Sequence, residues 1–154
     1  MTTKNQSAGL LVYRRRDATL EVLLVHPGGP FWQKRDEGAW SIPKGEVAEN
    51  EVDVDVARRE FHEELGVAAP DGEFSPLGEV RQKGGKVVRA WAVGGDLDVS
   101  RLRSNTFEIE WPPRSGKMRE FPEVDRAGWF DLETARGKLL PAQREFLDRL
   151  EGLL

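Results

Sequence analysis

The sequence predicts a protein of the α/β or α+β class, with a central mixed sheet and helices packed on it. Short apolar segments bounded by turn-forming residues recur along the chain, as is typical of strands. Only a few segments show helical spacing, and they are interleaved with these strands. The chain has 154 residues, enough for one domain with a proper hydrophobic core. We therefore expect a single domain over residues 1–154.

Composition excludes several classes of protein. Lys plus Arg number 23 and Asp plus Glu 27, and this net charge of −4 argues against a nucleic-acid-binding surface. With no cysteine, the chain has no disulfide, zinc-thiolate site or thiol nucleophile. Residues 1–7 are polar, unlike a signal peptide, and no apolar run approaches the roughly 20 residues that span a bilayer. We expect a cytoplasmic monomer or homodimer with no nucleic-acid or membrane partner.

The first part of the chain predicts a hairpin, a long loop and a brief strand. Residues 8–13 and 20–25 are apolar and short, and Arg14–Asp17 between them ends in a turn-forming residue. Residues 26–39 contain prolines and glycines that favour a long loop, and such loops are often functional. Residues 40–42 resemble a short strand, which Pro43 and the following residues would stop.

A helix is expected next, over residues 53–65, with Gly66 as its C-terminal stop. At about 100° per residue, four apolar side chains share one face: Val54, Ala57, Phe61 and Leu65. Three glutamates fall on the adjoining face, where like charges three and four residues apart repel: Glu60, Glu63 and Glu64. A hard divalent cation such as Mg²⁺, which prefers carboxylate oxygens, would neutralise them. The simplest interpretation is a magnesium site that handles phosphates.

The rest of the chain returns to strands and ends in helices. We expect strands over 76–81 and 87–93 joined by a basic turn, a third strand over 106–111 and a basic loop over 112–120. A short strand over 129–130 and a short helix over 132–138 follow. A final helix is expected to begin at Pro141, with Phe146, Leu147, Leu150 and Leu153 on its apolar side.

The segment Gly45–Val67 resembles the Nudix box of the Nudix hydrolase family. Every fixed place of that pattern is filled, although Phe61 is bulkier than the usual aliphatic residue: Gly45, Glu51, Arg59, Glu60, Phe61, Glu63, Glu64, Gly66 and Val67. The resemblance implies an α/β/α sandwich with a central mixed sheet. It also implies hydrolysis of a nucleoside diphosphate linked to another group, with Mg²⁺ (or Mn²⁺ in its place) neutralising charge and activating water.

The same resemblance assigns roles to individual residues. Glu60, Glu63 and Glu64 match the metal ligands, and the backbone at Gly45 would add a carbonyl ligand. One of these glutamates, or a carboxylate from another loop, would serve as general base. Glu51 and Arg59 match the places that brace the loop and orient the glutamates. Family members often add an acid from a loop before a late Trp strand. Here two residues compete for that place: Glu123, which we favour, and Glu120.

Several residues are candidates for substrate contact, each beside a structural alternative. Lys44 next to the metal loop suits a phosphate. Phe31, Trp32 and Trp111 can stack on a base or pack in the protein, and the loop position favours Trp32 as a contact. Trp40 and Trp129 are expected in the core, and His62 is expected to be structural or exposed. A basic group would clamp distal phosphates or simply be solvated: Arg114, Lys117 and Arg119.

The residues leading into the box indicate a substrate. Pro43-Lys44-Gly45 resembles the variant found in dinucleoside polyphosphate and diphosphoinositol polyphosphate hydrolases. An acidic chain disfavours the inositol compounds, so we expect diadenosine polyphosphates such as diadenosine tetraphosphate. Gln82 stands where the ADP-sugar subgroup tends to have proline, which disfavours that subgroup. Many dinucleoside polyphosphate hydrolases place a tyrosine downstream of the box to stack on adenine, whereas the single tyrosine here, Tyr13, lies upstream. Two alternatives stay open: a pyrophosphatase of (d)NTPs or modified nucleotides, and a non-catalytic nucleotide-binding Nudix module.

Overall fold

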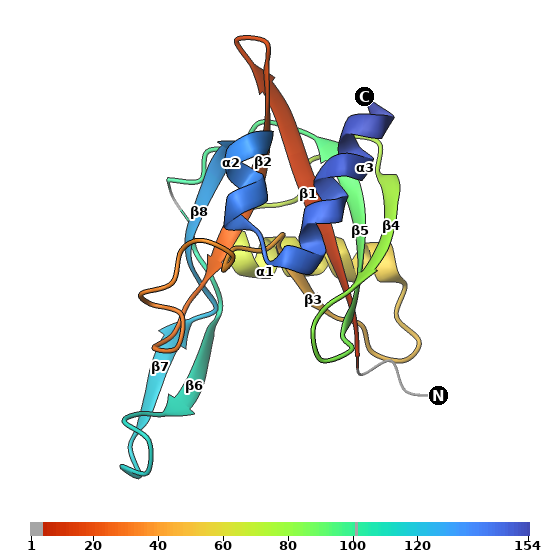
Figure 1. The fold of residues 1–154 in the computed structure, drawn as a ribbon. Coiled ribbons are helices and arrows are strands. Elements are labelled where there is room, and N and C mark those ends of the chain that lie inside the picture. Colours follow the sequence, from red (N-terminus) through yellow and green to blue (C-terminus); the bar gives the residue numbers. More distant parts are fainter. Residues whose placement is uncertain (1–4, 101) are drawn as a thin grey trace.

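A six-stranded mixed sheet forms the middle layer of the molecule (Figure 1). The computed structural model describes residues 5–100 and 102–154. Five strands lie in the order β4-β5-β1-β2-β8, and β3 pairs with β1. Strands β1 and β5 run parallel and the other pairs are antiparallel, which confirms the expected mixed sheet. The strands are β1 (Gln6–Arg16), β2 (Thr19–Pro27), β3 (Lys44–Glu46), β4 (Ser75–Arg81), β5 (Val87–Gly94) and β8 (Val124–Asp131).

Helices cover both faces of this sheet, and each face has its own core. Side chains alternate along β1, so that Leu10 packs toward α1 and Leu11 packs toward α3. In Figure 1, α2 and α3 lie in front of the sheet and α1 lies behind it. The α/β/α sandwich is therefore confirmed. Its helical elements are α1 (Asp53–Leu65), α2 (Leu132–Lys138), the 3₁₀ turn η1 (Pro141–Arg144) and α3 (Glu145–Leu153).

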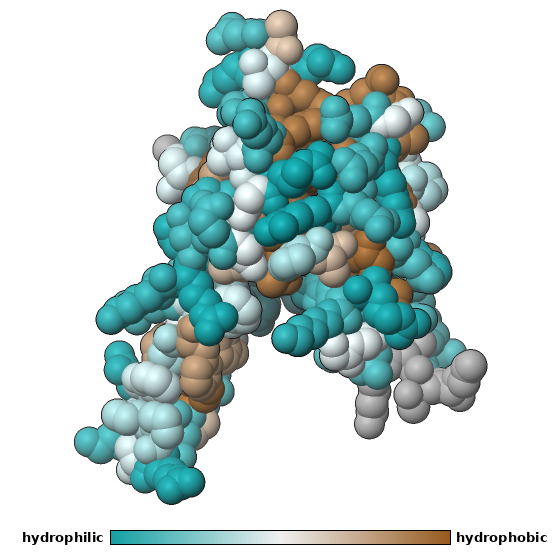
Figure 2. Space-filling view, viewed as in Figure 1, coloured by the Kyte–Doolittle hydropathy of each residue, from teal (hydrophilic) through white to brown (hydrophobic). Residues whose placement is uncertain are grey.

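A second, two-stranded sheet projects from the sandwich as an arm. Its antiparallel strands are β6 (Thr106–Glu110) and β7 (Met118–Pro122). Figure 1 shows this hairpin extending well beyond the three layers, and Figure 2 shows apolar surface along its inner side. Strand β7 continues almost directly into β8, so the base of the arm is fixed to the edge of the main sheet.

Some element boundaries differ from the expected ones. The turn of the first hairpin is only Asp17 and Ala18, both with positive φ (52° and 68°), and residues 14–16 belong to β1 rather than to the turn. Two left-handed residues match the right-handed twist of the flanking strands, which allows a two-residue connection. Residues 40–42 form isolated bridges and no continuous strand: Ser41 bridges to Val25, and Trp40 bridges to Leu139. The strand lies just after them, as β3.

The later part of the chain shows similar differences. The expected basic loop 112–120 is partly strand, since β7 begins at Met118, and β8 is longer than the expected 129–130. Helices α1 and α2 begin and end where expected, and Gly66 closes α1 with φ of 75°. Within α1 the buried valine is Val56 rather than Val54, and Leu153 of α3 is half exposed. In the described part of the chain, no helix has the length and apolar character needed to cross a membrane.

Candidate active site

The site begins where β3 leads toward α1. Strand β3 pairs with the first residues of β1, and Gly45 lies opposite Ala8. A Cβ atom built on Gly45 would lie 1.9 Å from Oε1 of Glu60. The carboxylate of Glu60 therefore occupies the space that any larger residue at position 45 would fill. This close approach explains the glycine without any appeal to a special backbone conformation.

Arg59 and Glu51 brace the loop between β3 and α1. Oε1 of Glu51 accepts a hydrogen bond from the Ala48 backbone N–H at 2.7 Å, and its Oε2 pairs with Arg59. The Arg59 guanidinium also lies 3.8 Å from Glu60 and 3.9 Å from Glu63. The hydrogen bond from Arg59, together with that from Ala48, holds the pKa of Glu51 below its ordinary value. The geometry therefore agrees with the bracing role expected for these residues.

Two glutamates of α1, Glu60 and Glu64, resist ionisation. Burial raises the pKa of Glu60 to about 7, and a hydrogen bond with Glu63 and the charge of Glu63 add to this shift. Burial also raises the pKa of Glu64 to about 8, although the neighbouring Lys44 opposes the change. A positive charge placed among these oxygens would therefore stabilise the ionised form of the carboxylates.

Glu123, and not Glu120, is brought to this cluster. The Glu123 N–H donates to the Asn105 carbonyl at 2.8 Å, and the Asn105 N–H donates to the Glu63 carbonyl at 2.9 Å. Glu123 lies at the open rim, and partial burial together with the charge of Glu63 raises its pKa. Glu120 is exposed on β7, opposite Glu108 of β6. The extra acid is therefore connected to α1 by backbone hydrogen bonds.

Lys44 and two of these acids line one cavity of about 180 Å³. Lys44 is half-buried, and burial lowers its pKa, with the charge of Lys86 adding to the effect. A cation beside carboxylates at the floor of a small cavity is suited to holding a phosphate oxygen next to a metal ion. The cavity is lined by Val25, Pro27, Ser41, Ile42, Lys44, Glu64, Glu123 and Val124.

The donor set fits a hard divalent cation by its chemistry. Four neighbouring carboxylates, three of which have pKa values raised chiefly by burial, are with backbone carbonyls the oxygen ligands that Mg²⁺ and Mn²⁺ prefer. Across residues 5–100 and 102–154, however, no three His, Asp or Glu side chains already enclose a point where an ion would sit. The side chains of Glu60, Glu63, Glu64 and Glu123 would have to turn toward a shared centre to bind one.

The other residues expected to contact substrate lie farther out. Trp32 is half-buried in the loop between β2 and β3, with the Arg35 guanidinium 5.6 Å from its ring. Phe31 of this loop meets Trp111 of the hairpin, with ring centroids 5.5 Å apart. The basic group is exposed on the projecting arm, away from the elements that carry the glutamates (Figure 1): Arg114, Lys117 and Arg119.

Sequence reasoning missed a second depression beside Glu123. It has a volume of about 160 Å³ and is lined by Gly29, Gln33, Phe121, Pro122 and Asp125. The Phe121 ring, which also lies beside Phe107 and Arg119, and the exposed Gln33 amide offer an aromatic surface and hydrogen-bonding groups. The one available signal was that Phe121 is near Glu123 in the sequence. The contribution of Gln33 depends on how the loop folds back, which spacing does not reveal.

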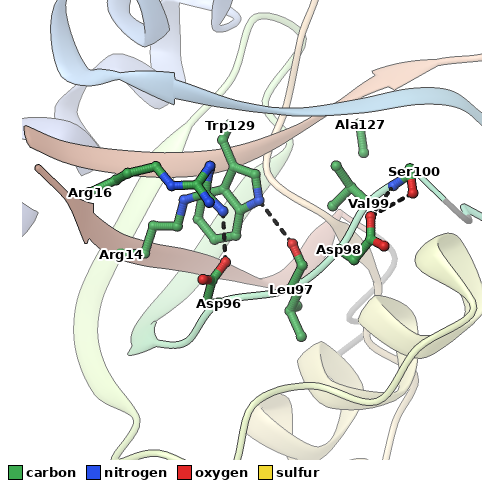
Figure 3. A pocket seen from close by; sticks show the side chains of 9 residues that line it. All are labelled: Arg14, Arg16, Asp96, Leu97, Asp98, Val99, Ser100, Ala127 and Trp129. Carbon is green, nitrogen blue, oxygen red and sulfur yellow. Dashed lines mark hydrogen bonds and ion pairs between the residues drawn. The ribbon is translucent and has the colours of Figure 1, made fainter.

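A larger cavity of about 580 Å³ lies elsewhere (Figure 3). It is lined by Arg14 and Arg16, at the end of β1 opposite to the residues that pair with β3. The Arg14 guanidinium lies 4.1 Å from the Trp129 ring centroid and pairs with Glu21 and Asp96. Trp129 is thus partly buried at a cavity wall rather than enclosed in the core, whereas Trp40 is buried as expected. No residue of the box lines this cavity.

Comparison with known proteins agrees with this fold. Solved structures of similar fold include an Ap4A hydrolase of C. elegans in a binary complex, with 20% identity, TM-score 0.66 and 96% of each chain covered. A mutT/nudix family protein of Listeria innocua has 18% identity and TM-score 0.65, covering 99% of this chain and 95% of that one. The NUDIX domain of Shewanella oneidensis NrtR, complexed with ADP ribose, has 16% identity and TM-score 0.64, covering 96% and 86%.

At these identities the structural matches establish the fold alone. A comparison with curated protein sequences gives no match. The sequence model of the NUDIX domain, in contrast, matches residues 3–150, almost the whole chain. The chain therefore belongs to the Nudix family, and its domain indicates a pyrophosphohydrolase that acts on phosphoanhydride bonds.

Proposed function

We propose that the protein is a Mg²⁺-dependent pyrophosphohydrolase that cleaves a nucleoside diphosphate linked to another moiety. The preferred substrates are diadenosine polyphosphates such as diadenosine tetraphosphate. The observation that carries this proposal is the grouping of Glu64, Glu123 and Lys44 around one small cavity, with Glu60 and Glu63 beside Glu64 on α1. A carboxylate cluster with raised pKa values beside a partly buried lysine suits a metal ion and an anionic substrate together.

The residues divide the work in the following way. Glu60, Glu63, Glu64 and Glu123 hold Mg²⁺ (or Mn²⁺), assisted by the backbone at Gly45, and the ion neutralises charge and activates water. Lys44 binds a phosphate oxygen, and Arg59 with Glu51 keeps the helix glutamates oriented. A general base works best when its pKa is near the working pH. Burial raises the pKa of Glu60 and Glu64 toward this range in the metal-free protein, and a bound cation would lower both pKa values again.

Two features favour a dinucleoside substrate. Pro43-Lys44-Gly45 resembles the variant found in dinucleoside polyphosphate hydrolases, and an Ap4A hydrolase of C. elegans is among the similar solved structures. The depression beside Glu123 offers the Phe121 ring to one base, and Trp32 of the neighbouring loop offers a second aromatic face. The exposed basic residues of the arm remain candidates for contacts with distal phosphates.

A product analysis tests the proposal. The pure protein is incubated with Mg²⁺ and a panel of dinucleoside polyphosphates, (d)NTPs, modified nucleotides and ADP-sugars, and products are identified by mass in water labelled with heavy oxygen. We expect mononucleotide release from the dinucleoside compounds. Glu63→Gln and Glu64→Gln should each lower turnover about a hundredfold or more. The matched control, Glu120→Gln, changes an exposed acid on β7 and should leave turnover unchanged.

The second candidate is a pyrophosphatase of (d)NTPs or modified nucleotides. A single aromatic ring in a depression of about 160 Å³ suits one base rather than two, and this observation favours a mononucleotide. Preferential release of pyrophosphate from triphosphates would support it over the first choice. Tight nucleotide binding without hydrolysis of any compound, with either Mg²⁺ or Mn²⁺, would instead identify a non-catalytic Nudix module.

A further inference from the structure

Strand β8 contains a β-bulge just where it reaches the site. His26 of β2 pairs with Arg126 of β8, and the next residue, Pro27, pairs with Val124. Asp125 is therefore an extra residue on β8 with no partner across the strand pair. An extra residue of this kind reverses the alternation of side chains along one strand and redirects those beyond it.

The reversal is visible in the packing of β8. Ala127 and Trp129, both odd-numbered, pack against the core beneath α1. Val124, which is even-numbered, packs into this same core and is only 4% exposed. In a strand without a bulge, Val124 would face the other way, and Glu123 would turn with it. The direction of Glu123 therefore depends on the bulge.

His26 locks the bulged residue in place. Its side chain is fully buried, and its Nδ1 lies 2.7 Å from Oδ1 of Asp125. Its Nε2 lies 2.6 Å from the carbonyl oxygen of Arg35 in the loop that precedes β3. Both oxygens are acceptors, and the ring nitrogen that carries the hydrogen donates to the oxygen it faces, as the tautomer decides. The edge contact with Trp40, at 5.2 Å between centroids, fixes the plane of the ring.

The same short segment also grips Glu123 directly. Two residues after His26, the Gly28 N–H donates to the Glu123 carbonyl at 2.9 Å. A Cβ on Gly28 would lie 2.0 Å from the Pro122 carbonyl oxygen, so the two backbones are in close contact. Residues 26–28 therefore hold residues 122–125 from two sides, while His26 itself lines neither the cavity with Lys44 nor the depression beside Glu123.

We propose that His26 is a positioning residue: through Asp125 it locks the β8 bulge that directs Glu123 toward the glutamates of α1. The inference rests on the proposed function in one respect, because it takes Glu123 as a ligand of the metal ion. His26 touches neither metal nor substrate, and it acts by limiting the directions that the Glu123 carboxylate can take.

A double-mutant cycle between His26 and Glu123 tests this inference. His26→Leu removes both contacts of the ring nitrogens, and His26→Asn retains a polar side chain that can donate toward Asp125. Each is combined with Glu123→Gln. The readouts are the dissociation constant for Mn²⁺, followed by electron paramagnetic resonance, the turnover of the best substrate, and the melting temperature. The matched control is Asp36→Asn, which loosens the other anchor of the same loop, because its hydrogen-bond partners Trp40 and Lys138 both lie outside β8.

We expect His26→Leu to weaken Mn²⁺ binding about 10- to 100-fold, as is typical when a partner of a metal ligand is lost. His26→Asn should recover most of this affinity. In the Glu123→Gln background, His26→Leu should add little, because the side chain that it orients is already disabled. Asp36→Asn should leave Mn²⁺ affinity unchanged.

Other results would overturn the inference. Additive losses in the double variant, an equal effect of Asp36→Asn, or a silent Glu123→Gln each mean that His26 acts elsewhere. If His26→Leu does not fold, Asp125→Ala breaks the same contact at a side chain that is 30% exposed, and the same outcomes apply. Mn²⁺ binding without hydrolysis would overturn the proposed activity alone. Absence of Mn²⁺ binding by the unchanged protein would overturn both the metal site and the inference.

Discussion

Gly45 shows how a single missing side chain shapes the site. The Glu60 carboxylate fills the space beside it, so Gly45→Ala would push that carboxylate away from its present position. The displaced atoms belong to a flexible side chain, and we therefore expect the fold to survive while Mn²⁺ affinity falls about tenfold or more. Titration with Mn²⁺ and a melting curve measure the two effects separately.

The matched control for this substitution is Gly152→Ala in α3. No atom lies within 4 Å of a Cβ built there, and we expect metal affinity to stay unchanged. An unaltered Mn²⁺ affinity in Gly45→Ala would show that metal binding does not depend on the space that Gly45 leaves for the Glu60 carboxylate.

Glu64 makes the stability of the metal-free protein depend on pH. Its pKa is about 8 in the folded state and about 4.5 in an unfolded chain, so between these values the folded state binds the extra proton. The contribution of this group is therefore fully present below about pH 4.5 and is lost as pH rises through about 8. We expect the melting temperature in EDTA to fall over this range and Glu64→Gln to flatten the slope.

Added Mg²⁺ should oppose this loss of stability, because the ion binds the ionised carboxylate in the folded state. A melting temperature in EDTA that rises steadily from pH 5 to pH 8, with the same rise in Glu64→Gln, would contradict the assignment.

The helix glutamates are predictable from sequence because they lie within one turn of each other. Glu60, Glu63 and Glu64 are neighbours in any α-helix, and so their mutual effect on ionisation follows from local spacing. The positions of Glu123 and His26 depend instead on pairing between β2 and β8. The family resemblance indicated Glu123 as a candidate but gave no reason to connect His26, which was expected at the start of a loop, with the site.

At the scale of the element, α1 is held by its buried face rather than by its ends. Its N-cap, Val52, makes no side-chain capping bond, while Phe61 is fully buried against β1 and its neighbours. We expect Phe61→Ala to reduce the free energy of unfolding by about 3–5 kcal/mol. Urea denaturation measures this change.

The adjacent residue supplies the control. His62 is exposed, as expected, and His62→Ala should change stability by no more than about 0.5 kcal/mol. Alanine has a higher helix propensity than either residue, so a comparable loss in both variants would contradict the assignment of this stability to the buried face of α1.

Helices were predicted more accurately than strands for a physical reason. The ends of α1 and α2 are marked by local features, such as the left-handed Gly66 and the Asp131 side chain that accepts from the Thr134 N–H. Strand ends depend on partners elsewhere in the chain. Residues 40–42 have the composition of a strand, yet the ladder forms at Lys44–Glu46, where the first residues of β1 are available for pairing.

At the scale of the whole molecule, we expect substitutions on the projecting arm to change substrate affinity without changing the stability of the fold. The exposed group Arg114, Lys117 and Arg119 lies beyond the sandwich, so replacing all three by Ala should leave the melting temperature nearly unchanged. If the arm reaches over long substrates, the KM for diadenosine tetraphosphate should rise several-fold more than the KM for a nucleoside triphosphate. Steady-state kinetics at low salt measure this, since exposed charges are screened at high salt.

Equal changes in KM for the two substrates would mean that these residues belong to a solvated loop.

The layered architecture was predictable, because alternating apolar segments and two helical faces require a sheet covered on both sides. The direction of the arm was not, because nothing in residues 106–122 reports where the hairpin points relative to the sandwich.

The connection of Glu123 to Gly28, Asn105 and Glu63 has a consequence for the order in which the protein matures. Contacts between segments distant in sequence form late, after local hairpins and helices. A growing chain acquires the acids of α1 long before it acquires the strand that presents the fourth. Hydrolytic competence should therefore be among the last properties to emerge during synthesis, so that the nascent polypeptide remains inert toward nucleotides until β8 has docked.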